Sequence, residues 1–311
     1  MPKKVKLIFN PMADMGRARR IANDLRAVVE EFDGEASWSD TIYPTHAMEL
    51  AGQAASEGYD RVVALGGDGT VHEVINGLMR IPAERRPLLG IVPIGSGNDF
   101  AHALGIPAQA ERALALALNG QASPVDIGLL TDETRGRQEY FDNTVGIGFD
   151  AIVNIRSHQL PIVKGFLMYL TAVIQTILLN HHPACIRFES DREAWDDCVL
   201  MTTICNGPRE GGGFLISPES KLDDGVMQIL TVQRVSRPMM FRLLPEFIKG
   251  THLRFPTIRL QSFKKIRLES DRPLYIHADG EVITSFGSNV RRLLFEALPS
   301  ALQVVRGPAV A

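Results

Sequence analysis

The segment Val62–Asn76 limits the possible folds more than any other part of the chain. The run Arg61–Leu65 predicts a buried strand, and it ends abruptly in Gly66–Thr70, read Gly-Gly-Asp-Gly-Thr. A helical pattern of apolar residues begins directly afterwards. A strand that passes through a short glycine loop into a helix is typical of a parallel α/β sheet, in which ligands bind beyond the carboxyl ends of the strands.

The chemistry of this loop suits a phosphate. Its three glycines leave the backbone amides open to a polyanion, and Asp68 adds a carboxylate that a phosphate-bound Mg²⁺ can use. Thr70 and Glu73 have the spacing of a capping box, which predicts a helix N-terminus aimed at the same point. The alternative is a tight strand-to-helix turn in which Asp68 satisfies local amides. Three glycines around one acid favour the phosphate site.

Composition agrees with an ordinary globular protein. The 311 residues are 45% apolar and 22% charged, which allows two domains or one large domain. Cys185, Cys198 and Cys205 lack the spacing of metal ligands or redox motifs, so a reduced cytoplasmic compartment is expected. No room for a signal peptide precedes the strand-like Val5–Phe9. The longest apolar stretch, Phe166–Leu179, is too short to cross a bilayer.

Strand and helix patterns alternate along residues 1–126, which predicts a parallel sheet covered on both faces. Three loops then meet at the carboxyl edge of that sheet: Asn10–Gly16, Gly66–Thr70 and Gly95–Asp99. The expected strands are Val5–Asn10, Ala36–Tyr43, Arg61–Leu65 and Leu89–Ile94, and the expected helices are Gly16–Phe32, Thr45–Glu57, Thr70–Met79 and Asn98–Leu104.

The texture of the sequence changes near residue 126. Short runs of strand-forming residues, separated by Gly, Pro and Asp-Gly turns, predict a β-rich second domain over residues 127–291. Helical patterns interrupt it at Lys164–Leu179 and Arg237–Lys249. The final residues, 292–311, are expected to return to the first domain, because sheets often recruit a terminal strand.

A second loop, Pro93–Phe100, repeats the strand–glycine–helix arrangement, and Asn98-Asp99 predicts a helix cap there. The two loops together resemble the catalytic domain of the diacylglycerol and sphingosine-type lipid kinases, especially the soluble bacterial ones. Further ordered matches extend the resemblance over nearly the whole chain: Asn10-Pro11, Asn143–Asp150, Asn206-Gly207, Gly211–Gly213, Leu222–Gly225 and Asp279–Glu281.

The resemblance implies an α/β domain like that of NAD kinase and phosphofructokinase, followed by a C-terminal β-sandwich. It also implies transfer of the γ-phosphate of ATP, with Mg²⁺, to a lipid alcohol, with diacylglycerol giving phosphatidic acid as the leading reaction. Asp68 is then a catalytic residue that serves the phosphates through Mg²⁺. The positions that match the family's nucleotide contacts are Asn10, Thr41, Gly66, Gly67, Asp68, Gly69, Thr70, Val71, His72, Glu73, Ser96, Asn98 and Asp99.

Two further roles follow from the same resemblance. Glu281 is the candidate general base for the acceptor hydroxyl, although Asp279–Gly280 between two strand-like runs is also a two-residue hairpin signature. A structural Mg²⁺ would be bound by the carboxylate of Asp224 and the backbone carbonyls of Lys221 and Val226. The alternative at this second position is an ordinary Asp-Gly turn.

Two segments of the second domain could contact a membrane, and each has a second interpretation. Phe166–Leu179 is apolar nearly all round, which favours a core helix over one that lines an acyl-chain cleft or lies on a bilayer. Between Val232 and Leu268 the chain carries nine Lys and Arg residues but one acid, Glu246. Such a basic bias can hold an enzyme against anionic lipid headgroups, and it can also be a solvated face.

The chain departs from the family's pattern in one loop, and other classes of function remain as alternatives. Family members often carry Gly-Lys-Gly where this chain has Asp14–Gly16, so Arg17 or Arg20 is the candidate cation. The alternatives are phosphorylation of a soluble metabolite by an NAD kinase-like enzyme, or a non-catalytic lipid-binding relative. A nucleic-acid role is disfavoured, because the basic run lacks interleaved aromatic residues. The sequence leaves the oligomeric state, including a homodimer, open.

Overall fold

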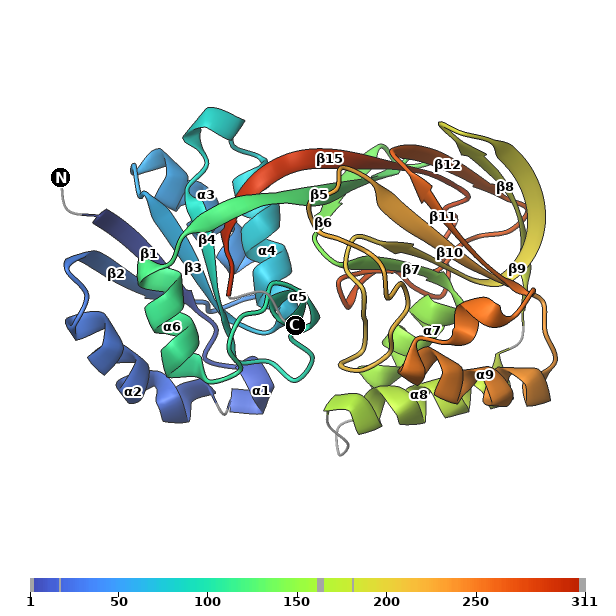
Figure 1. Ribbon diagram of the computed structural model, residues 1–311, viewed down its shortest axis with the longest axis horizontal. Coiled ribbons are helices and arrows are strands. Elements are labelled where there is room, and N and C mark those ends of the chain that lie inside the picture. Colours follow the sequence, from blue (N-terminus) through green and yellow to red (C-terminus); the bar gives the residue numbers. More distant parts are fainter. Residues whose placement is uncertain (1–2, 17, 161–164, 181, 308–311) are drawn as a thin grey trace. The chain divides into compact units, whose positions relative to one another are not determined.

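The computed structural model describes residues 3–16, 18–160, 165–180 and 182–307 (Figure 1). Two compact units divide the chain. The first comprises Met1–Val125 with Ser300–Ala311, and the second comprises Asp126–Pro299. Two strands, β5 (Ala122–Asp132) and β15 (Arg292–Val305), contribute residues to both units.

The first unit is built on a parallel sheet of the order β2-β1-β3-β4-β15, with the C-terminal end of β15 beside β4. Every residue of β3 is buried, as expected for a strand covered on both faces. The parallel α/β sheet predicted from the sequence is therefore confirmed. Its other strands are β1 (Lys3–Phe9), β2 (Gly34–Asp40), β3 (Arg61–Gly66) and β4 (Leu88–Pro93).

Helices of the first unit pack in pairs, α3 against α4 and α2 against α6. The helix expected over Gly16–Phe32 corresponds to α2, whereas the short α1 and the helix α6 were not predicted. The helices are α1 (Ala13–Gly16), α2 (Ala18–Glu30), α3 (His46–Ser56), α4 (Asp68–Met79), α5 (Asp99–Ala103) and α6 (Ala110–Asn119), with a 3₁₀ turn η1 (Ala83–Arg85).

The second unit is rich in antiparallel strand pairs, in agreement with the predicted β-sandwich. A core of aromatic and aliphatic side chains, including Phe141, Phe188 and Phe295, packs between its strands. The strands are β5 (Ala122–Asp132), β6 (Arg137–Phe141), β7 (Thr144–Gly148), β8 (Ala184–Ser190), β9 (Ala194–Cys205), β10 (Met227–Gln233), β11 (Ile258–Phe263), β12 (Lys265–Ser270), β13 (Ile276–Ala278) and β14 (Glu281–Thr284).

A helical layer covers one side of this sheet. It consists of α7 (Phe149–Ser157), α8 (Gly165–Leu179) and α9 (Arg237–Lys249), with a 3₁₀ turn η2 (His252–Arg254). A second apolar core lies between these helices and strands β9 and β10. The two predicted helical interruptions are confirmed as α8 and α9, although Lys164 lies outside the described residues. The short helix α7 was missed.

Two findings bear on the expected reduced cytoplasmic compartment, and the second, a disulfide, removes the argument that the cysteines gave for it. In the described part of the chain, each helix is too short or too polar to span a bilayer. The register of β8 and β9 places Cys185 opposite Cys198, and the two form a disulfide with Cα atoms 3.9 Å apart. The sequence spacing gave no sign of this pairing, because it depends on strand register. Cys205 is buried and is not part of a disulfide.

Candidate active site

The two glycine loops of the first unit are joined through Asp68. Its Oδ2 accepts the backbone amide of Asn98 at 2.7 Å, and its Oδ1 accepts the amide of Asp99 at 2.8 Å. The side chain of Asn98 does not cap α5 as predicted. Instead, Asn98 bonds to both the amide and the carbonyl of Gly95 and closes its own loop. Asp68 therefore accepts backbone amides, as the alternative interpretation expected, but those amides belong to the second loop and not to its own.

The predicted capping box at the start of α4 is wrong. The helix begins at Asp68, and its N-cap makes no side-chain hydrogen bond. The Oγ1 of Thr70 accepts a hydrogen bond of 3.0 Å from Asn10 Nδ2 at the end of β1. Glu73 accepts the amides of Thr45 and Ala47 and thereby caps the neighbouring helix α3. The sequence correctly indicated that Glu73 caps a helix, but the capped helix is α3, which lies next to α4 in space.

Close contact between the loops explains why glycine stands at two of these positions. A Cβ atom added to Gly95 would lie 2.4 Å from the Cα of Gly67, and one added to Gly67 would lie 3.0 Å from the Cα of Gly95. A Cβ on Gly66 would overlap Thr70. These glycines permit the two loops to touch, whether or not a phosphate also approaches them.

The remaining candidates for nucleotide contact differ in exposure. Ser96 is exposed at the tip of the second loop, and Thr41 is half-buried where β2 ends, with its amide bonded to the carbonyl of Phe9 at 2.8 Å. Val71 and His72 are buried within α4. Gly69 is half-buried in the first turn of that helix. Arg20 is exposed on α2, and Arg17 lies outside the described residues.

Glu281 follows a tight turn in the second unit. Ala278 and Glu281 pair across the β13–β14 hairpin, and both central residues have positive φ: 48° for Asp279 and 87° for Gly280. This is the two-residue hairpin that the Asp-Gly pair predicted, and positive φ at its second position favours glycine. Glu281 is exposed at the first position of β14.

Asp279 has a structural role that sequence reasoning missed. Its buried carboxylate accepts three backbone amides, those of Asp142, Asn143 and Thr144, at 2.9–3.0 Å. These bonds attach the hairpin that carries Glu281 to the start of β7. Nothing in the local sequence marks such a contact, because its partners are more than a hundred residues away.

The predicted metal site is a surface turn. Asp224 is exposed, and its Oδ1 accepts the amide of Val226 at 3.2 Å. Gly225 has a φ of 74° and donates its amide to the buried Asp126 at 2.6 Å. A carboxylate next to backbone carbonyls, such as that of Lys221, is a donor set that fits a hard cation such as Mg²⁺.

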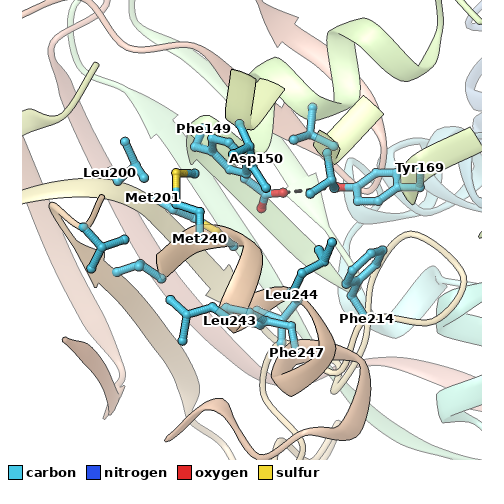
Figure 2. Close-up of a pocket in the computed structure, with 16 residues that line it drawn as sticks. Phe149, Asp150, Tyr169, Leu200, Met201, Phe214, Met240, Leu243, Leu244 and Phe247 are labelled. Atoms are coloured by element: carbon cyan, nitrogen blue, oxygen red, sulfur yellow. Dashed lines mark hydrogen bonds between the residues drawn. The ribbon is translucent and has the colours of Figure 1, made fainter. Parts of the chain in front are cut away.

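An apolar cavity of about 70 Å³ lies within the second unit, among α7, α8, α9 and strands β9 and β10 (Figure 2). Met240, Leu243 and Phe247 of α9 line it together with residues of the other elements. Asp150 and Tyr169 stand at its polar end, where the Tyr169 hydroxyl lies 3.1 Å from Asp150 Oδ1. Within the described residues, the walls of the cavity are thus apolar, and polar groups that can form hydrogen bonds lie at one end.

A buried polar cluster lies behind that polar end. Glu210 and His277 join Asp150 and Tyr169, and the hydroxyl of Tyr169 donates to Glu210 Oε1 at 2.6 Å. Burial raises the pKa of Glu210, and the nearby charge of Asp150 raises it further, while His277 opposes both effects. Burial and the two carboxylates also raise the pKa of Tyr169 well above its usual value.

An α/β unit with two interlocked glycine loops, followed along the chain by a β-rich unit, is an arrangement typical of a phosphotransferase. Residues 4–130 match the diacylglycerol kinase catalytic domain. Residues 143–306 match the YegS C-terminal NAD kinase beta sandwich-like domain. The chain therefore belongs to the diacylglycerol kinase and YegS-like family of lipid kinases.

Individual relatives agree with this assignment. The chain is 28% identical to a diacylglycerol kinase of Mycobacterium tuberculosis over 97% of its own length and 95% of that protein. A Chromohalobacter salexigens protein named "Probable lipid kinase YegS-like" is 32% identical over 82% of this chain and 78% of its own. A crystal structure of a Bacillus anthracis diacylglycerol kinase shares the fold, with a TM-score of 0.76, 23% identity, and coverage of 100% and 99% of the two chains. The resemblance seen in the sequence, and the kinase class that it implied, are confirmed.

Proposed function

We propose that this kinase uses ATP and Mg²⁺ to phosphorylate the hydroxyl of a membrane lipid alcohol, with diacylglycerol as the leading acceptor and phosphatidic acid as the product. The observation that carries this proposal is the apolar cavity of the second unit, which ends in hydrogen-bonding groups. An acyl chain can bury its apolar surface against walls of this kind, whereas a polar, soluble metabolite gains little from them. The cavity is smaller than a complete acyl chain, so α8 and α9 would have to separate further when lipid enters.

The first unit offers the donor site. The loops that Asp68 joins lie at the carboxyl ends of β3 and β4, the usual edge for a nucleotide in a parallel sheet. Amides in such loops suit phosphate oxygens, and the exposed Ser96 adds a hydroxyl. Mg²⁺ would neutralise the charge that develops on the transferred phosphoryl group. Since the carboxylate of Asp68 already accepts two amides, we infer that it supports the phosphate site mainly by fixing the loop.

The second unit supplies the base. Glu281 is exposed on a hairpin that Asp279 fixes to the backbone, which is the arrangement that a general base needs: a free carboxylate on a rigid support. In the proposed reaction Glu281 removes the proton of the acceptor hydroxyl while the hydroxyl oxygen attacks the γ-phosphorus. The bond between that phosphorus and the β,γ-bridging oxygen breaks, and ADP leaves. Asp224 would bind a second, structural Mg²⁺ at the surface turn, together with the carbonyls of Lys221 and Val226.

The outer surface of the helical layer suits a membrane. The inner face of α8 contributes to the core, but Leu167, Ile174 and Leu178 are 62%, 37% and 55% exposed along its outer face. On α9 the exposed apolar residues are Met239, Phe241 and Ile248. We call these six residues the outer apolar face. Exposed cations lie on or next to α9: Arg234, Arg237, Arg242, Lys249 and Arg254.

Exposed apolar side chains next to positive charges suit the surface of an anionic bilayer. There, apolar side chains enter the headgroup region and cations contact lipid phosphates. Arg237 also connects the two helices, because its Nε donates to the carbonyl of Ile177 at 3.0 Å. We infer that the enzyme works at the surface of an anionic membrane and binds lipid through α8 and α9. No homodimer is needed for this arrangement.

Transfer of radiolabelled γ-phosphate tests the proposal. Purified protein is supplied with Mg²⁺, labelled ATP and mixed micelles of diacylglycerol, monoacylglycerol, ceramide, a sphingoid base, or NAD in solution, with a protein-free reaction as the blank and Asp68→Ala as the weakened variant. Label in a lipid, and none in NAD, supports the proposal. Label in NAD alone would instead establish the NAD kinase-like alternative.

A further inference from the structure

His277 on β13 is completely buried, and both of its near neighbours at Nε2 are carboxylates. Nε2 lies 3.1 Å from Glu210 Oε1 and 3.7 Å from Asp150 Oδ2, and all three side chains are buried. Within the described residues, neither ring nitrogen makes a hydrogen bond of good geometry, so the two carboxylates act on Nε2 as close charges. The chemistry of this imidazole is therefore determined on its Nε2 side.

Neutral hydroxyl groups surround the two carboxylates. Thr203 Oγ1 donates to Asp150 Oδ2 at 2.9 Å, and Thr144 Oγ1 donates to Glu210 Oε2 at 3.2 Å, in addition to the Tyr169 hydroxyl described above. Hydroxyl groups satisfy hydrogen bonds but add no positive charge. Two adjacent buried carboxylates remain unfavourable unless a cation or a shared proton compensates them.

A protonated His277 would provide that compensation. Burial alone lowers the pKa of His277, but the negative charges of Glu210 and Asp150 close to Nε2 outweigh burial and raise the pKa to about 10. A Cβ atom added to Gly146 would lie 2.1 Å from Nε2, so the backbone of β7 closes the cluster on that side. The trio therefore carries a net charge of about −1 when both carboxylates are ionised.

The cluster connects the cavity with the hairpin. Asp150 at the start of α7 and Tyr169 on α8 line the polar end of the cavity. His277 precedes Asp279 by two residues and Glu281 by four on the same hairpin. No other described side chain of β13 or β14 faces both carboxylates within ion-pair distance.

We propose that His277 is a positioning residue for phosphoryl transfer: its imidazolium, held between Asp150 and Glu210, fixes the hairpin that carries Glu281 against the polar end of the apolar cavity. This inference rests on the proposed role of Glu281 as the base. It goes beyond that role, because it assigns the placement of the base to a buried charge balance rather than to the turn alone.

The first test compares His277→Asn with His252→Asn. His252 is a matched control, because it is also fully buried and its Nε2 faces a carbonyl oxygen, that of Ile216 at 3.0 Å, rather than two carboxylates. We expect His277→Asn to lower kcat at least tenfold with KM for ATP within twofold of the wild type. His252→Asn should change the melting temperature with kcat within threefold. Equal kcat losses in the two variants would overturn the proposal.

Charge rescue supplies a readout that a merely structural role would not give. Glu210→Gln added to His277→Asn returns the net charge of the trio to its original value. We expect the double variant to recover at least half of the lost activity on a logarithmic scale. Activity no better than that of His277→Asn would count against a charge role.

Two measurements on the wild-type protein do not depend on activity. Imidazole ¹³C and ¹⁵N shifts should show His277 as an imidazolium at pH 8, and a neutral ring there would overturn the proposal. Metal analysis after dialysis is the second measurement, because bound metal that Glu210→Gln abolishes would make the trio a metal site instead. If the wild type phosphorylates no lipid while the ring is charged, the proposed function fails and the charge cluster stands as a finding without a catalytic role.

Discussion

The Oδ2 of Asp68 accepts a 2.7 Å hydrogen bond from the amide of Asn98, thirty residues further along the chain. One carboxylate at the end of β3 thus fixes the loop at the end of β4. The glycine loop is recognisable by its sequence, but its acid serves the neighbouring loop, and a ligand contact would come in addition. The first prediction follows from this bond.

Replacing Asp68 by Ala should release the second loop and weaken the donor site. We expect KM for ATP to rise at least tenfold and the free energy of unfolding to fall by about 1.5–3 kcal/mol, the usual range for hydrogen bonds to a charged group. Asp60→Ala is the matched control, since Asp60 also accepts a backbone amide, that of Lys4 at 2.8 Å, but lies at the exposed, opposite end of β1. An unchanged KM for ATP in Asp68→Ala would contradict the prediction.

Glu281→Gln should fold normally and lose kcat by about 10²–10⁴-fold, the range typical of a general base. The side chain is exposed at the first position of β14, so the melting temperature should not change. Kinetics with the best lipid acceptor and a thermal melt give both values. Glu269→Gln, at an exposed position of β12, is the control for loss of one surface charge. Turnover near that of the wild type would remove Glu281 from the mechanism.

Asp224→Ala should raise the Mg²⁺ concentration needed for half-maximal activity and lower the melting temperature measured with Mg²⁺. Both effects have the same cause: the variant lacks the carboxylate ligand and the bond to the amide of Val226. Asp223→Ala, its exposed neighbour, controls for charge. A Mg²⁺ titration identical to that of the wild type would mean that the turn acts as a turn alone.

Replacing Leu167 and Leu178 together by Ser should reduce binding to vesicles that contain phosphatidylglycerol. Wild-type binding should rise with phosphatidylglycerol content and fall with added salt, because the cations near α9 act through screened charge. Ile42→Ser is the control, since Ile42 is 77% exposed but belongs to the first unit. Vesicle flotation measures the bound fraction. If the bound fraction changed neither in the double variant nor with added salt, the outer apolar face would be excluded as the surface that contacts the membrane.

Glu246 should make stability depend on acid pH. The hydroxyl of Thr251 and the guanidinium groups of Arg242 and Arg254 lower the pKa of Glu246 to about 2. A lowered pKa means that the folded state favours the carboxylate, so this stabilisation is complete above about pH 4.5 and disappears as the pH falls towards 2. Urea titrations between pH 6 and 2 should show a smaller pH dependence for Glu246→Gln than for the wild type.

Local patterns predicted much of the fold. The run Arg61–Leu65 became the fully buried β3, and Arg237–Lys249 became α9 with the same bounds, because apolar spacing and a serine before a Pro-containing first turn are local signals. The helix α7 was missed. It begins after Gly148, whose φ of 76° redirects the chain in a way that composition does not announce. The sequence also could not pair Cys185 with Cys198, since strand register decides that contact.

The site was predictable by residue type but not by partner. Glu73 has the spacing of a cap and does cap a helix, but the helix is α3, which only the packing of α3 against α4 brings into reach. His277 and Glu210 gave no signal, because they are 67 residues apart and meet only after β7, β9 and β13 pair. Buried charge clusters of this kind are tertiary features.

The contact between Gly67 and Gly95 restricts how the enzyme can be re-engineered. Each glycine occupies the volume that a side chain on the other would need, so neither position accepts a larger residue unless the backbone of the other loop shifts. A chimera that imports one loop from a distant relative would bring mismatched shapes together. Both segments should therefore be exchanged as a single cassette, and libraries that randomise them separately should yield few folded clones.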